Sequence, residues 1–262
     1  MDRELRLIMS VTRNLPRIRG VGRFCNIIKR FYLRKKRPVE EVDVLGLKME
    51  LDPAEFVDGL LLLAPQIYEF REVAFMNAHL QGGDVFLDAG AYIGIYSLLA
   101  SRLVGPKGMV LAVEAEPYNY NRLEGNIKLN RLRNVRAVHV GLSSRKERLH
   151  MSINSQGNRG NSSFVSTGPG VEVDCLPLLD VLNVNGITKL DGAKFDLEGF
   201  EYRVLKKFFS DAPPTLYPGF VIVECFRRNV QKAGGNTVEL LKGNGYKVFS
   251  SSRGCEYAMV RQ

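Results

Sequence analysis

The sequence predicts an α/β fold in which helices cover a mostly parallel β-sheet. The clearest sign is the stretch 83–100, GDVFLDAGAYIGIYSLLA, in which a short apolar run, a glycine turn and an amphipathic helical pattern follow one another. Similar apolar runs recur, and two of them end in Glu114 and Glu224. The last two runs, 246–250 and 257–261, are joined by a Ser/Gly turn. We therefore expect a parallel sheet that ends in an antiparallel hairpin.

Length and charge favour one main domain with a small basic appendage. A chain of 262 residues, 45% of them hydrophobic, can bury one substantial core. The net charge of +9 is concentrated in residues 1–37, which hold twelve Lys and Arg against two acids, whereas the other 225 residues sum to −1. This division gives an N-terminal segment at 1–37, a hairpin and helical subdomain at 38–83 and a main domain at 84–262.

The basic segment 1–37 is also amphipathic. Its apolar positions on one helical face are Phe24, Ile27, Ile28, Phe31 and Tyr32. A helix of this kind suits an anionic membrane surface, or less specifically RNA. The alternative is a helix that packs on the main domain and leaves its basic face to solvent.

Cysteine use and hydropathy bear on the cellular compartment. The four cysteines form no CxxC pair, so the sequence suggests neither a disulfide framework nor a zinc site. No apolar run approaches the roughly eighteen residues of a membrane span, and the first residues lack the apolar core of a signal peptide. We expect a cytoplasmic protein whose membrane contact, if it has one, is peripheral and made through residues 1–37.

The elements on either side of the glycine turn can be placed in order. Alternation at 42–47 indicates a short hairpin, and 55–80 is helical with a break at Pro65, so this part should wall a substrate pocket. Pro117 begins a helix that Asn130 ends. Further strands are expected at 135–140, 145–153, 171–173, 193–197 and 220–223, with helices at 176–182, after Glu198 and through 238–241.

One long stretch, 154–170, is rich in Ser, Asn and Gly. It lies between two of the expected strands. A loop of this length in a compact domain is usually a lid or a substrate contact. An unstructured loop is the alternative.

The glycine turn predicts a ligand site. Gly90 and Gly94 let the backbone approach a ligand where a Cβ would collide, at the sheet edge where open α/β folds bind ligands. The spacing D-x-G-x-x-x-G differs from the G-x-G-x-x-G of dinucleotide sites, and no Lys-Ser or Lys-Thr pair follows. A ligand without phosphates is therefore favoured. Glu114, twenty residues after Gly94, is placed to accept hydrogen bonds from a ribose diol.

These residues resemble the FkbM-type methyltransferases. VFLDAGAYIGIYSLLA is similar to the first motif of that family, AVEAEP to its second, and KFDLEGFEYRVLKKF to the element in which Asp and Glu follow the fourth strand. YEFRE before the first strand is similar too, so four ordered elements match between residues 65 and 224. The resemblance implies a Rossmann-like class I fold with a seven-stranded sheet, and S-adenosyl-L-methionine as cofactor.

The resemblance also implies which residues hold the cofactor. They are Glu69, Asp88, Gly90, Tyr92, Gly94, Glu114 and Leu142. In this set Glu69 would meet the cationic end of the methionine moiety, and Leu142 would lie by the adenine. The chain departs from the family pattern at Tyr92, where Asn is usual, and at Ser144, where Asp commonly follows the third strand.

Asp196 and Glu198 follow the fourth strand, and we expect them to remove a proton from the acceptor or to orient it. Acids favoured by the start of a helix are the alternative for both residues. We predict a site without a metal. A second possibility is that Asp196, Glu198 and Glu224 converge as hard oxygen ligands for magnesium.

The expected reaction is methylation of a hydroxyl on a saccharide, a lipid-linked glycan or another small metabolite, with the acceptor class resting on the resemblance alone. One alternative is an RNA methyltransferase that uses the basic N-terminal segment, although the remaining residues are nearly neutral. Another alternative is a non-catalytic binding module on the same fold. That reading would require loss of motif residues, and Asp88, Gly90, Gly94 and Glu114 are all present.

Overall fold

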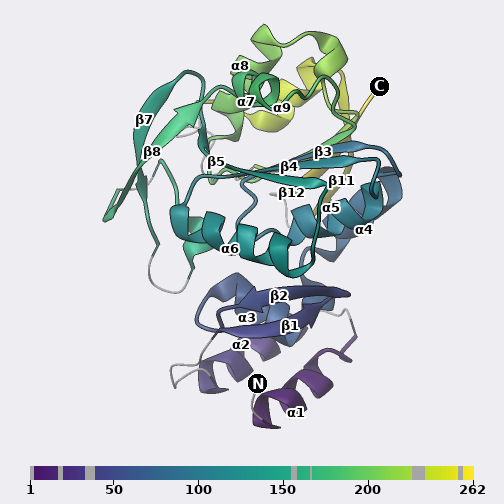
Figure 1. The fold of residues 1–262 in the computed structure, drawn as a ribbon, viewed down its shortest axis with the longest axis vertical. Coiled ribbons are helices and arrows are strands. Elements are labelled where there is room, and N and C mark those ends of the chain that lie inside the picture. The colour runs from purple at the N-terminus through teal and green to yellow at the C-terminus, as the bar shows by residue number, and fades with distance from the viewer. Residues whose placement is uncertain are drawn as a thin grey trace.

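The structure of the chain, a computed structural model, describes residues 3–16, 20–32, 39–154, 158–165, 167–225, 234–252 and 256–262. Its centre is a seven-stranded sheet with helices on both faces (Figure 1). This arrangement confirms the α/β fold class predicted from the sequence.

Most strands of the central sheet are parallel. The parallel strands are β3 (Val85–Ala89), β4 (Met109–Glu114), β5 (Val135–His139), β9 (Gly192–Phe195) and β10 (Phe220–Glu224). The expected hairpin consists of β11 (Tyr246–Ser252) and β12 (Glu256–Arg261), and β12 pairs antiparallel with β10. The order is β11-β12-β10-β9-β3-β4-β5. The chain therefore changes direction across the sheet between β3 and β9, and open α/β sheets bind ligands at such a switch point.

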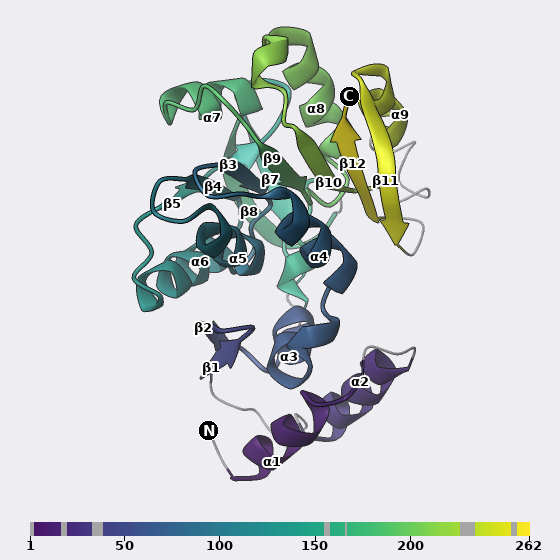
Figure 2. The ribbon, with the colours of Figure 1, turned by 90° about the vertical axis from the view of Figure 1, so that its right-hand side faces the viewer.

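Helices cover both faces of this sheet (Figures 1 and 2). On one face lie α4 (Phe70–His79), α5 (Ile95–Val104) and α6 (Pro117–Leu129), and on the other lie α7 (Leu178–Val184), α8 (Glu201–Asp211) and α9 (Thr237–Gly243). Because side chains alternate along a strand, Phe86 packs into the first core and Leu87 into the second. The strand β3 thus serves two apolar layers.

The residues before the sheet extend the first of these cores. The helices α1 (Arg3–Thr12) and α2 (Val21–Tyr32) pack against α3 (Phe56–Leu63), and β1 (Glu40–Val44) pairs antiparallel with β2 (Leu47–Leu51). The 3-10 turn η1 (Pro65–Ile67) separates α3 from α4, as expected from the break at Pro65. Leu5, Val44 and Phe86 belong to one apolar cluster, so these segments share a core with the sheet.

Polar contacts fasten the end of α1 to α3. The Arg13 guanidinium donates to the carbonyl oxygen of Leu62 through Nε at 3.0 Å and Nη2 at 2.9 Å, and Nη1 donates to the carbonyl oxygen of Asp43 at 2.6 Å. Burial lowers the pKa of Arg13, and the charge of Asp43 opposes that shift. This arginine is therefore a structural residue, although its charge belongs to the basic segment.

The predicted amphipathic helix exists as α2 and packs on α3. In α2, Val21 and Cys25 are buried, whereas Phe24 and Ile27 remain exposed. The side chains of Phe31 and Tyr32 lie outside the described set. In the described ranges, no helix combines the length and the apolar character needed to cross a membrane.

A small second sheet stands beside β5. It consists of β6 (Gly141–Leu142), β8 (Gly170–Leu176) and β7 (Glu147–Ser152), with β7 and β8 antiparallel, which confirms the expected strand pair. The short 3-10 helix η2 (Arg159–Asn161) lies between β7 and β8 in the chain, and η3 (Pro214–Leu216) precedes β10.

Candidate functional site

The turn between β3 and α5 presses against the end of β9. Gly90 has a φ of 85°, and a Cβ at this position would lie 1.8 Å from the carbonyl oxygen of Asp196. Gly94 has a φ of 95°, and a Cβ there would lie 2.5 Å from Cδ1 of Leu123. Both positions therefore require glycine, the first for close approach of two strand ends and the second for packing on α6.

A pocket opens at this switch point. It holds about 890 Å³ of space, a volume that includes solvent at its open side. The residues singled out from the sequence that line it are Glu69, Gly90, Tyr92, Glu114, Leu142, Asp196, Glu198 and Glu224. The fold thus brings together residues from six separate parts of the chain.

Glu114, at the end of β4, is held by two backbone amides. The Tyr92 N–H donates to Oε2 at 2.8 Å, and the Glu116 N–H donates to Oε1 at 2.9 Å. The side chain is only 7% exposed, and burial raises the pKa of Glu114 to about 7, against the effect of these amides. Each oxygen keeps a lone pair for another donor, as a ribose diol would require.

Tyr92 reaches away from the turn to the hairpin and helical subdomain. Its hydroxyl donates to Oδ1 of Asp58 on α3 at 2.9 Å, and the Arg122 guanidinium from α6 donates to the other Asp58 oxygen. Asp58 is fully buried, and burial raises its pKa while Arg122 opposes the rise. Tyr92 therefore connects the glycine turn to α3 and α6.

A buried lysine stands behind the pocket. Lys194 in β9 is 5% exposed, and its ammonium donates to Oδ2 of Asp196 at 2.6 Å and lies 4.7 Å from the centre of the Tyr96 ring. The Tyr96 hydroxyl donates to Oε2 of Glu69 at 2.7 Å. Burial by itself lowers the pKa of Lys194. The nearby carboxylates of Asp196, Glu69 and Asp88 outweigh this effect and raise the pKa above the ordinary value. Lys194 thus remains an ammonium that holds these acids in place.

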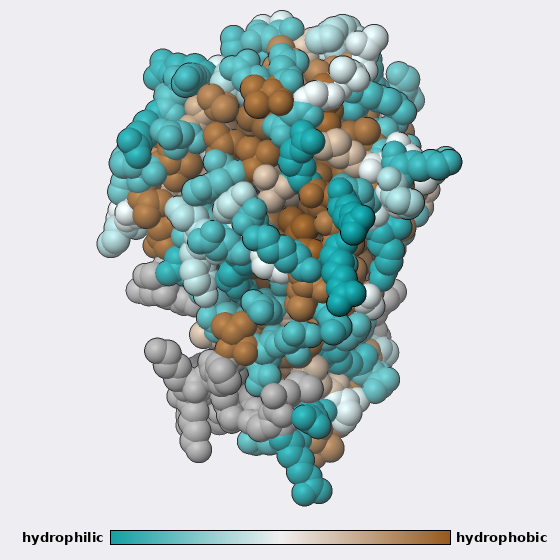
Figure 3. Space-filling view, viewed as in Figure 1, coloured by the Kyte–Doolittle hydropathy of each residue, from teal (hydrophilic) through white to brown (hydrophobic). Residues whose placement is uncertain are grey.

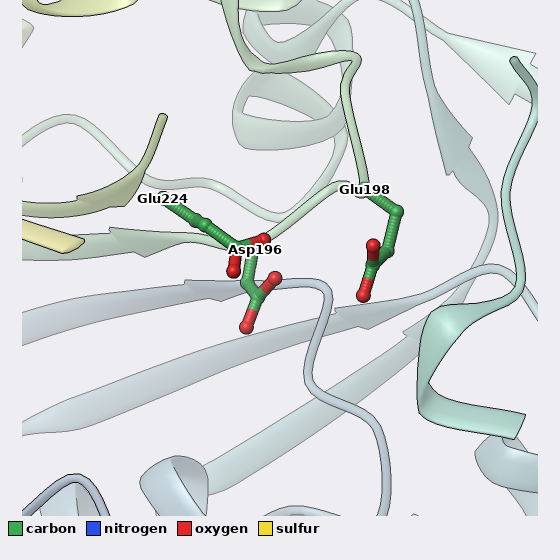
Figure 4. Close-up of side chains that lie close together, drawn as sticks. All are labelled: Asp196, Glu198 and Glu224. Atoms are coloured by element: carbon green, nitrogen blue, oxygen red, sulfur yellow. The ribbon is translucent and has the colours of Figure 1, made fainter. Parts of the chain in front are cut away.

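Three carboxylates converge where β9 and β10 end. Asp196, Glu198 and Glu224 each offer an oxygen within 4.8 Å of the others, and in Figure 4 their side chains extend toward the same space. Burial raises the pKa of Glu198 and of Glu224, and the charge of Asp196 raises both further. Such a group can hold protons at neutral pH or bind a divalent cation through its oxygens.

Backbone strain is concentrated around the pocket. Three non-glycine residues of its lining, Glu69, Tyr92 and Glu198, have φ values of 36°, 51° and 51°. A left-handed conformation costs about 1–3 kcal/mol at such positions and persists only where the surroundings enforce it. Packing of the surrounding residues, and not the backbone preference of each residue, therefore sets the direction of these three side chains.

The loop after β7 covers one side of the pocket. Arg159, Gly160 and Ser162 belong to the lining. The Arg159 guanidinium donates to Glu116 at 3.2 Å, and its backbone N–H donates to Glu55 at 2.8 Å. The part of the predicted lid or substrate loop at 158–165 thus contacts the pocket, whereas 155–157 and 166 lie outside the described residues.

Other residues chosen from the sequence lie next to the lining. Asp88 accepts a hydrogen bond from Ser97 Oγ at 2.6 Å and supports the start of α5 from below. Gly94 packs on Leu123, as described above. Ser144 accepts a hydrogen bond from Arg203 Nε at 3.2 Å and faces a separate groove beside α8. The first two positions therefore shape the turn, and the third is turned away from the pocket.

The sequence reading missed Lys194, Asp58 and Arg159. A signal was available for Lys194 alone, because a lysine inside a buried apolar strand needs a charged partner. Asp58 and Arg159 occupy ordinary helix and loop positions, and the pairings that give them a role join distant segments.

Comparisons with known proteins show the family of the chain. The family model of the methyltransferase FkbM domain matches residues 88–248. Methyltransferase sdnD of Sordaria araneosa is 31% identical over 169 residues, which cover 52% of this chain and 65% of that protein. A protein of Sulfolobus acidocaldarius, described as a probable cobalt-precorrin-6B C(15)-methyltransferase (decarboxylating), is 39% identical over 70 residues, 27% of this chain and 36% of its own. The chain thus spans less than two thirds of either relative.

Among solved structures, methyltransferase FkbM from Methylobacillus flagellatus KT aligns with 99% of this chain and 76% of its own, at 13% identity and a TM-score of 0.48. That similarity is too low to carry an argument about function. The family match does not depend on it, since it covers well over half of the chain and includes the glycine turn, Glu114 and the three converging carboxylates. The chain therefore belongs to the FkbM family of methyltransferase domains, whose cofactor is S-adenosylmethionine.

Proposed function

We propose that the protein methylates a hydroxyl group of a saccharide, a lipid-linked glycan or another small polyhydroxylated metabolite. The observation that carries this proposal is the convergence of Asp196, Glu198 and Glu224 within one pocket with Glu114. A hydroxyl acceptor must lose its proton during transfer, and a placed carboxylate contributes roughly 10² to 10⁴ in rate to such a step. Carboxylates also accept hydrogen bonds from neighbouring hydroxyls, which favours an acceptor with several of them.

The residues of the pocket fit the cofactor. Gly90 lets the turn that carries Tyr92 lie against the end of β9, and Glu114 keeps acceptor capacity on both oxygens. An apolar wall of Val140, Leu142 and Met151 suits the adenine. We assign the ribose to Glu114, the adenine to the side of Leu142, and the cationic end of the methionine moiety to Glu69. When bound, S-adenosylmethionine supplies a methyl group that its sulfonium has already activated.

In this proposal the carboxylates have separate tasks. Lys194 holds one oxygen of Asp196 at 2.6 Å and so sets the orientation of that carboxylate. Asp196 would take the proton of the acceptor hydroxyl. The oxygen of that hydroxyl would receive the methyl group as the bond from the methyl to the sulfonium sulfur breaks, which would leave S-adenosylhomocysteine. Burial raises the pKa values of Glu198 and Glu224 and so favours their protonated forms, which would donate hydrogen bonds that orient the acceptor. Positioning of this kind accounts for about 7–11 kcal/mol of a barrier.

The test compares turnover with cofactor binding in Asp196→Asn. The variant should lose at least about a hundredfold in turnover and retain its affinity for S-adenosylhomocysteine, because the lost interaction belongs to the transition state. The control is Asp180→Asn, which removes an exposed carboxylate on α7. Equal losses of turnover and affinity in Asp196→Asn would make Asp196 a cofactor ligand instead.

The acceptor is identified with a methyl-labelled cofactor and separate extracts of glycans, lipids and RNA. A labelled methyl ether on a glycan or small polyol supports the proposal, whereas label on RNA bases overturns it. The same reaction run with a chelator distinguishes the two uses of the carboxylates. Activity that survives chelation supports proton transfer by the carboxylates alone, and activity that returns only with magnesium supports a cation held by them.

A further inference from the structure

The two N-terminal helices expose apolar side chains to solvent. These side chains are Leu7, Val11, Phe24 and Ile27, with exposed fractions of 69%, 54%, 47% and 55%. We refer to them as the docking face. Monomeric proteins expose single apolar residues routinely, but several of them on two helices that pack on the same third helix are a feature of interaction sites.

The spacing of these residues places each pair on one side of its helix. Leu7 and Val11 are four residues apart in α1, and Phe24 and Ile27 are three apart in α2. Both helices pack their other sides on α3, and they form one end of the molecule in both views (Figures 1 and 2). In the space-filling view, apolar and hydrophilic atoms lie side by side at that end (Figure 3). The docking face is thus at the end of the molecule remote from the sheet.

The docking face belongs to a strongly basic segment of the chain. Arg3 and Arg23 are exposed on the same two helices, and the exposed acid Glu4 also lies on α1. Residues 1–37 as a whole carry +10, whereas the rest of the chain carries −1. Apolar side chains interspersed with arginines match the interface of a bilayer whose headgroups are anionic.

We propose that the docking face binds the surface of an anionic lipid bilayer. Leu7, Val11, Phe24 and Ile27 insert among the headgroups, and the arginines lie near the lipid phosphates. RNA would be attracted by the same charge, but it gains little from aliphatic side chains, because single-stranded nucleic acid binds through basic grooves and stacked aromatic rings. The exposed aliphatic residues therefore favour lipid.

The test is sedimentation of the full chain with vesicles of phosphatidylcholine that contain phosphatidylserine, at about 0.15 M salt. The parent should bind these vesicles. The partition coefficient should fall about tenfold or more in Leu7→Ser/Ile27→Ser and in Arg3→Gln/Arg23→Gln. Matched controls should bind as the parent does: Val184→Ser/Val248→Ser removes exposed apolar residues elsewhere, and Lys107→Gln/Arg133→Gln removes the same charge elsewhere.

Thermal unfolding and affinity for S-adenosylhomocysteine establish that each variant is folded. Val11→Ser/Phe24→Ser provides a second apolar pair, so the proposal remains testable if the first pair does not fold. Failure of the parent to bind vesicles overturns the proposal. It is also overturned if folded apolar variants bind vesicles as the parent does. Binding of single-stranded RNA that needs the arginines and ignores the apolar pairs would assign the face to RNA.

Discussion

Replacing Glu114 with alanine should weaken cofactor binding strongly without unfolding the protein. The two oxygens of Glu114 accept the backbone N–H groups of Tyr92 and Glu116 at 2.8 and 2.9 Å, and we expect the same oxygens to accept the ribose hydroxyls. A hydrogen bond to a charged group contributes about 1.5–3 kcal/mol. Because about 1.4 kcal/mol is a factor of ten, loss of one such bond should lower affinity about ten- to a hundredfold.

Calorimetry with S-adenosylhomocysteine measures this effect. The control is Glu124→Ala, which removes a carboxylate that pairs with Lys128 at 3.2 Å on the exposed side of α6. Thermal unfolding of the free proteins shows whether both variants are folded. Equal affinity of Glu114→Ala and the parent would refute the ribose assignment. A similar loss in Glu124→Ala would trace the effect to α6 and not to the pocket.

Two further predictions concern buried charges. Burial raises the pKa of Glu114 to about 7. Because its ionised form accepts the ribose hydroxyls, the calorimetric affinity for S-adenosylhomocysteine should fall below about pH 7, by at most about tenfold per pH unit, and Glu114→Gln should lack this dependence. A parent affinity that is the same between about pH 6 and 8 would contradict the argument. Lys194→Met leaves buried carboxylates without their ammonium and should lower the free energy of unfolding, measured by urea titration at neutral pH, by about 3–5 kcal/mol. The control Lys189→Met, which removes a surface pair with Asp191, should lower it by at most about 1 kcal/mol. Equal losses would show that Lys194 does not neutralise the site.

Much of the sheet could be predicted from the sequence because its signals are local. The run at 83–100 contains a strand, a turn with positive φ at two glycines, and a helix, and each follows from the residues within it. The same reasoning placed Glu114 at a strand end and the terminal hairpin at 246–261. The resemblance of ordered motifs then supplied the number of strands, which the structure confirms.

The neighbours of each functional side chain could not be predicted in this way. Spacing along one helix or strand determines which side a residue occupies, but it does not determine what another element places opposite that side. Tyr92 meets Asp58, which lies 34 residues earlier in the chain, and the contacts of Asp58 with Tyr92 and Arg122 depend on how α3 and α6 pack. The replacement of Asn by Tyr at position 92 became intelligible only through that packing.

The basic segment shows the same division. The sequence by itself determined that residues 1–37 are basic and that Phe24, Ile27 and Ile28 share one side of a helix. Only the tertiary structure decided that Ile28 packs partly on the core while Phe24 and Ile27 stay exposed. Periodicity shows which side of the helix is apolar. How much of that side α3 covers depends on the shape of its surface and on the angle at which the two helices pack.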